Sequence, residues 1–487
     1  MADSLKQKTA KGFLWSSIQN FSVKGFEFVL MLFMARLLGP KEYGTIGLLS
    51  VFMALSHLFI SSGFGSGLIR KKNRTQEDLC TVFFFNIGMS FLCYIILFII
   101  APYVADFYNI PVLSPLLRVI GITLIIGAFN TVQVAVFNFT LNFKTQAKIS
   151  IAHVIIGGLV GLTLAFLGYG VWALALQRVA ASISACVLCW TRAPWKPSWV
   201  FSMKSFKELF NYGYKLVVTG LINTLYNNVY PVLVGKFFSA DILGHSSRAY
   251  HWASFPSSNL TIILTNVTFA SLAKIQDDDV RLGRAYRKMI RTAAFVIFPS
   301  MFGLSAVAVP LMYVVLGPKW GLCAQILTII CFTYMLSPIH SLNNNLLLVK
   351  GRSDITLKLS IIQKIIGLTL MLTAAIKFGV IAIFYAGLIG SILMLFMNTY
   401  YTGKFINVGF WRQMKDITPT FILCIIMFAA VKLVIFAIPN IYIQLVVSIL
   451  VGAGIYIGLA YLLKFEELGE VWSMYKEIRK QRKKKQI

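Results

Sequence analysis

The chain of 487 residues is 58% hydrophobic, has a mean hydropathy of +0.76 and carries a formal net charge of +28. This composition excludes a soluble globular protein, and the apolar runs leave no room for a separate soluble domain. It also argues against a nucleic-acid partner, because the basic residues are spread over many short loops instead of gathering on one face.

Apolar runs punctuated by charge, glycine and proline predict an all-α integral membrane protein. The first run is long and no small-residue cleavage site follows it, so we expect a retained membrane helix and not a signal peptide. Because a spanning helix needs about 20 apolar residues, the runs predict about fourteen transmembrane helices. In chain order they lie at residues 11–35, 44–69, 79–105, 113–138, 146–167, 170–190, 206–236, 244–273, 285–316, 320–349, 355–377, 379–403, 415–437 and 440–463.

The connection RKKNRTQEDL at residues 70–79 is strongly basic, although apolar runs lie on both sides of it. Lys and Arg are concentrated in every second connection, starting with the N-terminal segment, and are scarce in the others. Because cytoplasmic loops carry the Lys/Arg excess, we expect both termini in the cytoplasm and this connection as a cytoplasmic clamp on the second and third helices. The basic tail at 466–487 is expected to rest on anionic headgroups.

The chain also repeats itself. The stretch ARLLGPKEYG at 35–44 matches GKFFSADILG at 235–244, and GVWALALQRVAASI at 170–183 matches GVIAIFYAGLIGSI at 379–392. The order and near-constant spacing of these matches predict an internal duplication, and an even number of helices in each copy makes the repeat parallel. The predicted parts are two six-helix lobes, 1–200 and 201–410, two additional transmembrane helices, 411–465, and the tail.

Several basic residues fall within predicted helices, where the single mid-helix acid is Glu27. A charge at the bilayer centre costs about 2.5–3.5 kcal/mol, so such residues are expected to face a cavity or a partner. Lys432, outside the repeat, is interpreted as structural. A cleft with excess positive charge attracts anions. We therefore predict a cationic cavity for an anionic substrate, lined by Lys24, Arg118, Arg178, Lys215, Arg248 and Lys364.

Alternatives remain open at several of these positions. Arg118 and Arg248 would instead reach water if they lie near helix ends. Lys24 and Glu27 are three residues apart on a helix and either neutralise each other or leave Glu27 as a site of proton or sodium coupling.

Two predicted helices carry a polar stripe at helical spacing. Asn20 in the first helix, and Asn223, Asn227 and Tyr230 in the seventh, are expected to line the cleft or, alternatively, to join helices by hydrogen bonds. The loop QDDDVRLGRAYRK is interpreted as an N-cap at Asp279 before a basic helix. No metal site, disulfide or cofactor is expected, and the scattered histidines are interpreted as packed.

A family resemblance rests on the stretches ARLLGPKEYG, GFGSGLIRKKNRTQEDLCTVFFFN, APYVADFY, LGYGVWALALQ and SRAYHWASFP, and spans residues 5–410. Together they make the sequence similar to the polysaccharide transporter family of the MOP flippase superfamily, the Wzx-like oligosaccharide flippases. The resemblance implies two six-helix lobes with extra C-terminal helices. Arg248 lies in the SRAY motif, whereas Tyr230 stands where relatives often carry an acid.

The resemblance further implies a flippase for undecaprenyl-diphosphate-linked oligosaccharide units, moved across the bacterial inner membrane by alternating access for O-antigen, capsule or exopolysaccharide synthesis. Implied partners are membrane lipids and polysaccharide polymerases, and no enzymatic activity is implied. The alternatives are a lipid II flippase, a multidrug or cation exporter of the same superfamily, and a membrane polysaccharide polymerase or ligase. The exporter fits the excess of cations poorly, and the polymerase would need a larger outside loop.

Overall fold

The computed structural model describes residues 22–61, 64, 67–68, 71, 73–470 and 472, and every regular element among them is a helix. The side chains of residues 212, 215–216, 259–260 and 262–270 lie outside this description. The chain forms two compact units, Met1–Gly244 (unit 1) and His245–Ile487 (unit 2).

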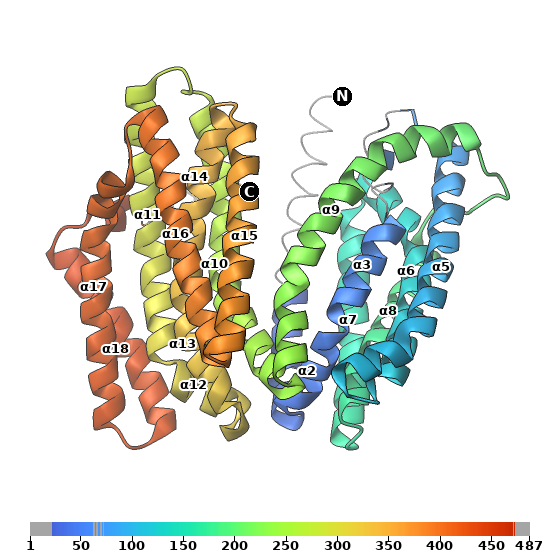
Figure 1. Ribbon diagram of the computed structural model, residues 1–487, viewed down its shortest axis with the longest axis horizontal. Helices are drawn as coiled ribbons and strands as arrows, with labels where there is room; N and C mark the ends of the chain where they lie inside the picture. Colours follow the sequence, from blue (N-terminus) through green and yellow to red (C-terminus); the bar gives the residue numbers. More distant parts are fainter. Residues whose placement is uncertain are drawn as a thin grey trace, which may run out of the picture. The chain divides into compact units, whose positions relative to one another are not determined.

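Unit 1 is a bundle of long helices in which neighbours in sequence pair side by side (Figure 1). The pairs α5–α6 and α7–α8 make its largest interfaces, and the long, curved α9 packs on α3 and α5. Residues 22–37 are helical, and the remaining helices are α2 (Pro40–Leu48), α3 (Ser50–Ser61), α5 (Gln76–Tyr108), α6 (Leu113–Phe139), α7 (Phe143–Phe166), α8 (Val171–Arg192), α9 (Met203–Phe237) and the start of α10 (Ala240–Ala273).

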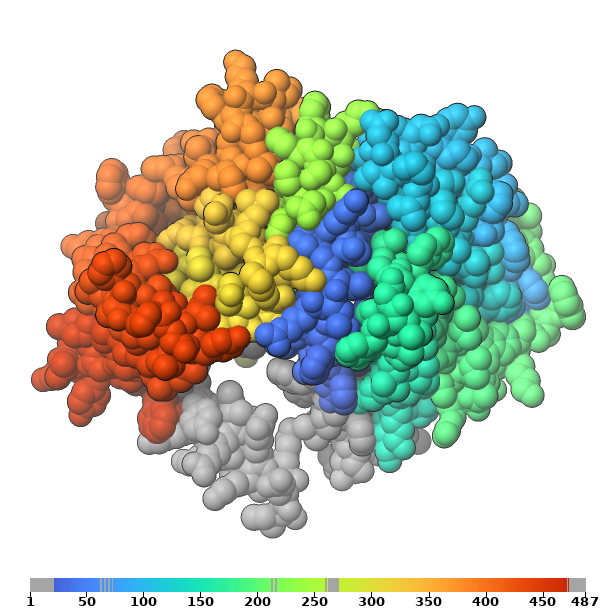
Figure 2. All heavy atoms as spheres, turned by 90° about the horizontal axis from the view of Figure 1, so that it is seen from below, coloured from blue at the N-terminus to red at the C-terminus, as the bar shows by residue number. Residues whose placement is uncertain are grey.

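Unit 2 continues α10 and adds a second bundle. Its main pairs are α11–α17, α15–α16 and α17–α18, and Figure 2 shows the atoms of α17 and α18 as one continuous block. The elements are α11 (Asp279–Ala306), α12 (Ala308–Leu316), the short 3-10 helix η1 (Pro318–Trp320), α13 (Gly321–Met335), α14 (Ser337–Val349), α15 (Ser353–Lys377), α16 (Val380–Ile406), α17 (Phe410–Ala437) and α18 (Ile441–Leu462).

The all-α membrane fold is confirmed. The helix at 22–37, α9 and α10 coincide with three further predicted transmembrane helices. They are not among the candidate spans below, so the count of fourteen remains a prediction. Eleven helical segments among the described residues are long and apolar enough to cross a membrane: Pro40–Ser61, Gln76–Tyr108, Leu113–Phe139, Phe143–Phe166, Val171–Arg192, Asp279–Ala306, Pro318–Val349, Ser353–Lys377, Val380–Ile406, Phe410–Ala437 and Ile441–Leu462.

Several predicted boundaries need correction. The helix expected from residue 44 begins at Pro40, because the fixed φ of proline suits the first helical position. The helix expected at 285–316 is interrupted at Val307, and the one at 320–349 turns at Leu336. Pro338 follows this second turn, and its missing N–H is tolerated because it starts the next helix.

Candidate functional site

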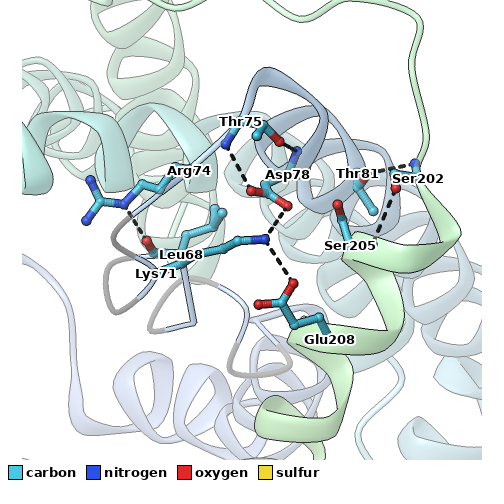
Figure 3. A network of polar contacts seen from close by, with 9 residues as sticks. All are labelled: Leu68, Lys71, Arg74, Thr75, Asp78, Thr81, Ser202, Ser205 and Glu208. Carbon is cyan, nitrogen blue, oxygen red and sulfur yellow. Dashed lines mark hydrogen bonds and ion pairs between the residues drawn. The ribbon is translucent and has the colours of Figure 1, made fainter.

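The basic connection between α3 and α5 contains a charged network around one buried carboxylate (Figure 3). The ammonium group of Lys71 lies 2.9 Å from Asp78 Oδ1 and 3.0 Å from Glu208 Oε2. The Asp78 side chain is only 1% exposed, whereas that of Glu208 is 58% exposed. Lys71 therefore joins the start of α5 to the first part of α9, two segments far apart in sequence.

Local sequence places Asp78 in this network. Thr75 caps α5 by accepting a hydrogen bond from the Asp78 backbone N–H, and the Thr75 N–H donates to Asp78 Oδ2 at 2.9 Å. This reciprocal capping box orients the carboxylate and leaves its other oxygen for Lys71. Burial by itself lowers the pKa of Lys71, but the hydrogen bonds to Asp78 and Glu208 outweigh it and raise that pKa above its ordinary value.

The connection between α8 and α9 docks on the same end of α5. The Ser202 N–H donates to Thr81 Oγ1 at 2.9 Å, and Ser202 in turn caps α9 (Figure 3). Gln76 accepts from Trp195 Nε1 and donates to the carbonyl of Lys196, both at 2.8 Å. The predicted clamp thus acts on α5 and, through a 2.7 Å hydrogen bond from Arg74 Nε to the Leu68 carbonyl, on the second predicted helix, as expected. The contact with α9 is an additional one. Sequence reasoning missed Asp78 and Glu208.

The cations predicted in unit 1 lie on four different helices. Arg118, near the start of α6, is half-buried, and its guanidinium carbon lies 4.2 Å from the centre of the Phe98 ring on α5. Its Nε is buried without a hydrogen-bond partner among the described residues. Arg178 on α8 and Lys24 on the helix at 22–37 are exposed within the structure. Lys215 is part of α9, but its side chain lies outside the description.

The predicted polar stripe on α9 is partly visible. Asn223 and Asn227 are exposed and Tyr230 is half-buried. The neighbouring Asn228, which the sequence interpretation passed over, is the acceptor of a 3.4 Å contact from the Ser50 hydroxyl on α3. One side of α9 therefore contacts α3 through a polar residue.

Two further predictions concern the N-terminal part of the chain. Asn20, predicted to line the cleft from the first helix, lies outside the described residues. Glu27, predicted as the coupling or pairing acid, is exposed on the helix at 22–37, as is Lys24.

Unit 2 holds the other predicted cations. Arg248 on α10 and Lys364 on α15 are both half-buried. Lys432 on α17 donates to the carbonyl oxygen of Ala306 at 3.1 Å, at the C-terminal end of α11. A cation at a helix C-terminus stabilises its last carbonyls, so the structural interpretation of Lys432 is supported by this contact.

The basic start of α11 is neutralised by acids from distant segments. Arg287 forms a bidentate pair with Asp416 of α17, at 2.7 and 2.6 Å. The N-cap of α11 is Asp278 and not Asp279, because the Asp278 carboxylate accepts from the backbone N–H of Arg281. Asp279 is the first helical residue, and both Asp278 and Asp279 thus have local structural roles.

Comparisons with known proteins agree on one class. A family model described as "Polysaccharide biosynthesis protein" matches residues 33–325. The teichuronic acid biosynthesis protein TuaB of Bacillus subtilis (strain 168) is 26% identical over 355 residues, 72% of this chain and 73% of that protein. The lipopolysaccharide biosynthesis protein WzxC of Escherichia coli (strain K12) is 24% identical over 402 residues, 81% and 80% of the two chains.

A solved structure extends the likeness to the fold. The lipid II flippase MurJ in an inward closed conformation superposes with a TM-score of 0.74 at 15% sequence identity, covering 93% of this chain and 98% of MurJ. At this identity the likeness concerns the arrangement of the helices.

Proposed function

Because the chain belongs to the polysaccharide biosynthesis protein family, we propose that it is a flippase for lipid-linked oligosaccharides that supply a surface polysaccharide. The transported unit is an oligosaccharide on undecaprenyl diphosphate, and it moves from the cytoplasmic to the periplasmic leaflet of the bacterial inner membrane by alternating access. Two relatives are named as biosynthesis proteins for teichuronic acid and lipopolysaccharide. These names support a role in polysaccharide export.

The observation that carries the substrate class is the half-buried cations within apolar helices. Arg118 on α6 and Lys364 on α15 lie on candidate membrane spans, Arg248 lies on α10, and each is half-buried. The Arg118 Nε is buried without a hydrogen-bond partner among the described residues. A buried cation is costly unless an anion or a polar group compensates it. A diphosphate supplies that compensation, and an arginine can bind it through two parallel hydrogen bonds.

The remaining parts of the proposal follow from this substrate. In this proposal the diphosphate is held by basic side chains, the sugars by polar side chains such as Asn223 and Asn227, and the polyprenyl chain stays in the bilayer. Both termini are cytoplasmic, so the basic tail faces anionic headgroups, and a polysaccharide polymerase receives the product on the other side.

A lipid II flippase is the second candidate, because the fold is similar to that of MurJ. Both substrates carry a diphosphate and a polyprenyl chain, so the cations fit either one. The lipid-linked glycan that accumulates when transport stops distinguishes the two candidate functions.

The test is to delete the gene in the strain that carries it and to identify the accumulating lipid-linked glycans by mass spectrometry. We expect a polyprenyl-diphosphate-linked oligosaccharide that disappears when the wild-type gene is restored. Accumulation of lipid II would favour the second candidate, and no accumulating glycan would reject both.

A further inference from the structure

A histidine in the middle of unit 2 has hydrogen-bonding neighbours at both ring nitrogens. His340 lies in the first turn of α14, within the candidate span Pro318–Val349. Its Nε2 is 3.0 Å from the Ser391 hydroxyl, and its Nδ1 is 3.2 Å from the Asn398 amide nitrogen. Both neighbours belong to α16, so three side chains of two helices form one polar cluster.

The hydrogen bonds define the state of the ring. An amide N–H donated by Asn398 makes Nδ1 an acceptor, and the proton of a neutral ring then resides on Nε2 and faces Ser391. Asn398 is fully buried, and its Oδ1 has no hydrogen-bond partner among the described residues. If the amide group rotates by 180°, this oxygen can accept a hydrogen bond from a protonated Nδ1, so the same cluster also accommodates a ring protonated on both nitrogens.

Polar side chains continue from this cluster towards the C-terminal end of α14. His340 lies roughly 14 Å from the end of α14, at 1.5 Å per residue. One turn nearer that end, Asn343 donates to Gln413 Oε1 at 3.3 Å, and Gln413 Nε2 donates to Thr402 Oγ1 at 2.9 Å. Buried polar chains of this kind within membrane helices mark proton or substrate paths.

The charged residues on the helices packed against α14 are mostly cationic. The helices packed on α14 are α11, α13, α15 and α16. Lys364 on the neighbouring α15 is half-buried, and an anion held by Lys364 would offset its repulsion of a second cation. The titratable residues of these four helices are Asp279, Arg281, Arg284, Tyr286, Arg287, Lys288, Arg291, Cys323, Cys331, Tyr334, Asp354, Lys358, Lys364, Lys377, Tyr385, Tyr400, Tyr401 and Lys404.

We propose that His340, held by Ser391 and Asn398, is a proton-binding site whose uptake and release of one proton drives the transport cycle. The ring takes the proton from water at Nδ1 and returns it to water, so no other reactant is needed. Histidine suits this role because its charge changes near neutral pH. His340 as a whole residue is half-buried. The coupling part of this inference rests on the proposed function.

The first experiment observes the proton itself. The full chain, labelled with 15N-histidine and placed in lipid nanodiscs, is titrated from about pH 5 to pH 8, and the His340 signals are assigned by their loss in His340→Gln. We expect a change from one protonated ring nitrogen to two. In Asn398→Asp a carboxylate lies beside Nδ1, so the change should occur at higher pH. A ring that keeps one protonated nitrogen throughout overturns the proposal.

The second experiment measures coupling in cells. His340→Gln keeps a neutral hydrogen-bonding side chain but cannot titrate. Wild-type export should accelerate when the external medium is acidified, whereas His340→Gln at equal abundance should lose this response and export on the order of tenfold less. The control is His153→Gln in α7, another membrane histidine, whose Nδ1 is buried without a hydrogen-bond partner among the described residues.

The outcomes separate this inference from the proposed function. The control variant should export and respond to pH like the wild type. If His340→Gln also does so, coupling at His340 is wrong although the flippase function stands. If gene deletion accumulates no lipid-linked glycan, the proposed function is wrong, and the nanodisc titration still decides whether His340 binds a proton.

Discussion

Gly44 and Gly244 meet where the first turns of α2 and α10 cross. A Cβ atom on Gly44 would lie 2.8 Å from the backbone nitrogen of Gly244, and a Cβ on Gly244 would lie 2.9 Å from the Cα of Pro40. These glycines end the two matching stretches ARLLGPKEYG and GKFFSADILG. The two stretches that the sequence analysis matched are thus packed backbone to backbone at these glycines.

Replacing either glycine should destabilise the protein. Gly44→Ala or Gly244→Ala places a methyl group against backbone atoms that cannot rotate away, and overpacking of this kind costs about 1–3 kcal/mol. We expect a lower thermal unfolding temperature of the purified protein and lower membrane abundance. Gly127→Ala in α6 is the control, because a Cβ there meets nothing within 4 Å. Equal losses in all three variants would show that the crossing is not the cause.

Removing Lys71 should destabilise the protein more than removing Glu208. Lys71→Ala leaves the buried Asp78 carboxylate without its counter-ion, a cost of about 3 kcal/mol, the low end for buried pairs because Lys71 retains some contact with water. Glu208→Ala removes an exposed partner, a loss of at most about 1 kcal/mol. Thermal unfolding in detergent measures both.

The double variant Lys71→Met with Asp78→Asn is the matched control for the previous prediction. It removes both charges at once, so no unpaired carboxylate remains and stability should return most of the way to that of the wild type. If the double variant is as unstable as Lys71→Ala, the ion pair is not what stabilises this connection.

The orientation of the chain in the membrane can be tested at two asparagines, one at each end of α5. Asn109 caps its C-terminal end and Asn73 precedes its N-terminal end, and both are exposed. With Asn73 in the cytoplasm, Asn109→Cys should react with an impermeant thiol reagent added to intact cells, and Asn73→Cys should react only after the membrane is opened. The reverse pattern would overturn the assignment of both termini to the cytoplasm.

Arg178 and Lys364 should each be needed for export. Their replacement by Ala should slow export about tenfold or more at unchanged abundance, because losing a charge-assisted hydrogen bond costs about 1.5–3 kcal/mol. Arg178→Lys should preserve part of the activity unless the anion is held by a bidentate contact. Lys377→Ala, an exposed cation at the end of the same helix as Lys364, should export normally. Normal export in both Ala variants would remove these residues from the binding site.

The sequence predicted most of the helices because each membrane-spanning run is a local property of the chain. It also located Lys432 as structural, since that residue lies outside the repeat. Breaks within runs were less visible: the interruption at Val307 has no proline or glycine at the residue itself. Only the packing of α11, α12 and α17 around it makes that interruption evident.

The polar contacts could not be predicted in the same way. His340 finds Ser391 and Asn398 at separations of 51 and 58 residues, and Lys71 reaches Glu208 across 137. A scattered histidine gives no periodic signal, so it was interpreted as packed. By contrast, the Thr75 to Asp78 capping box is a local pattern, and it could have identified Asp78 as an ordered acid.

The most direct measurement of the central claim is the leaflet that holds the glycan when the protein is depleted. Intact spheroplasts of the depleted strain are treated with periodate under conditions in which it does not cross the membrane, and the lipid-linked oligosaccharide is then extracted and analysed by mass spectrometry. The account predicts that the accumulated sugars remain unoxidised, because they stay in the cytoplasmic leaflet, and that restoring the wild-type protein makes them accessible. Oxidised sugars in the depleted strain would mean that the glycan crosses without this protein, and would contradict the account.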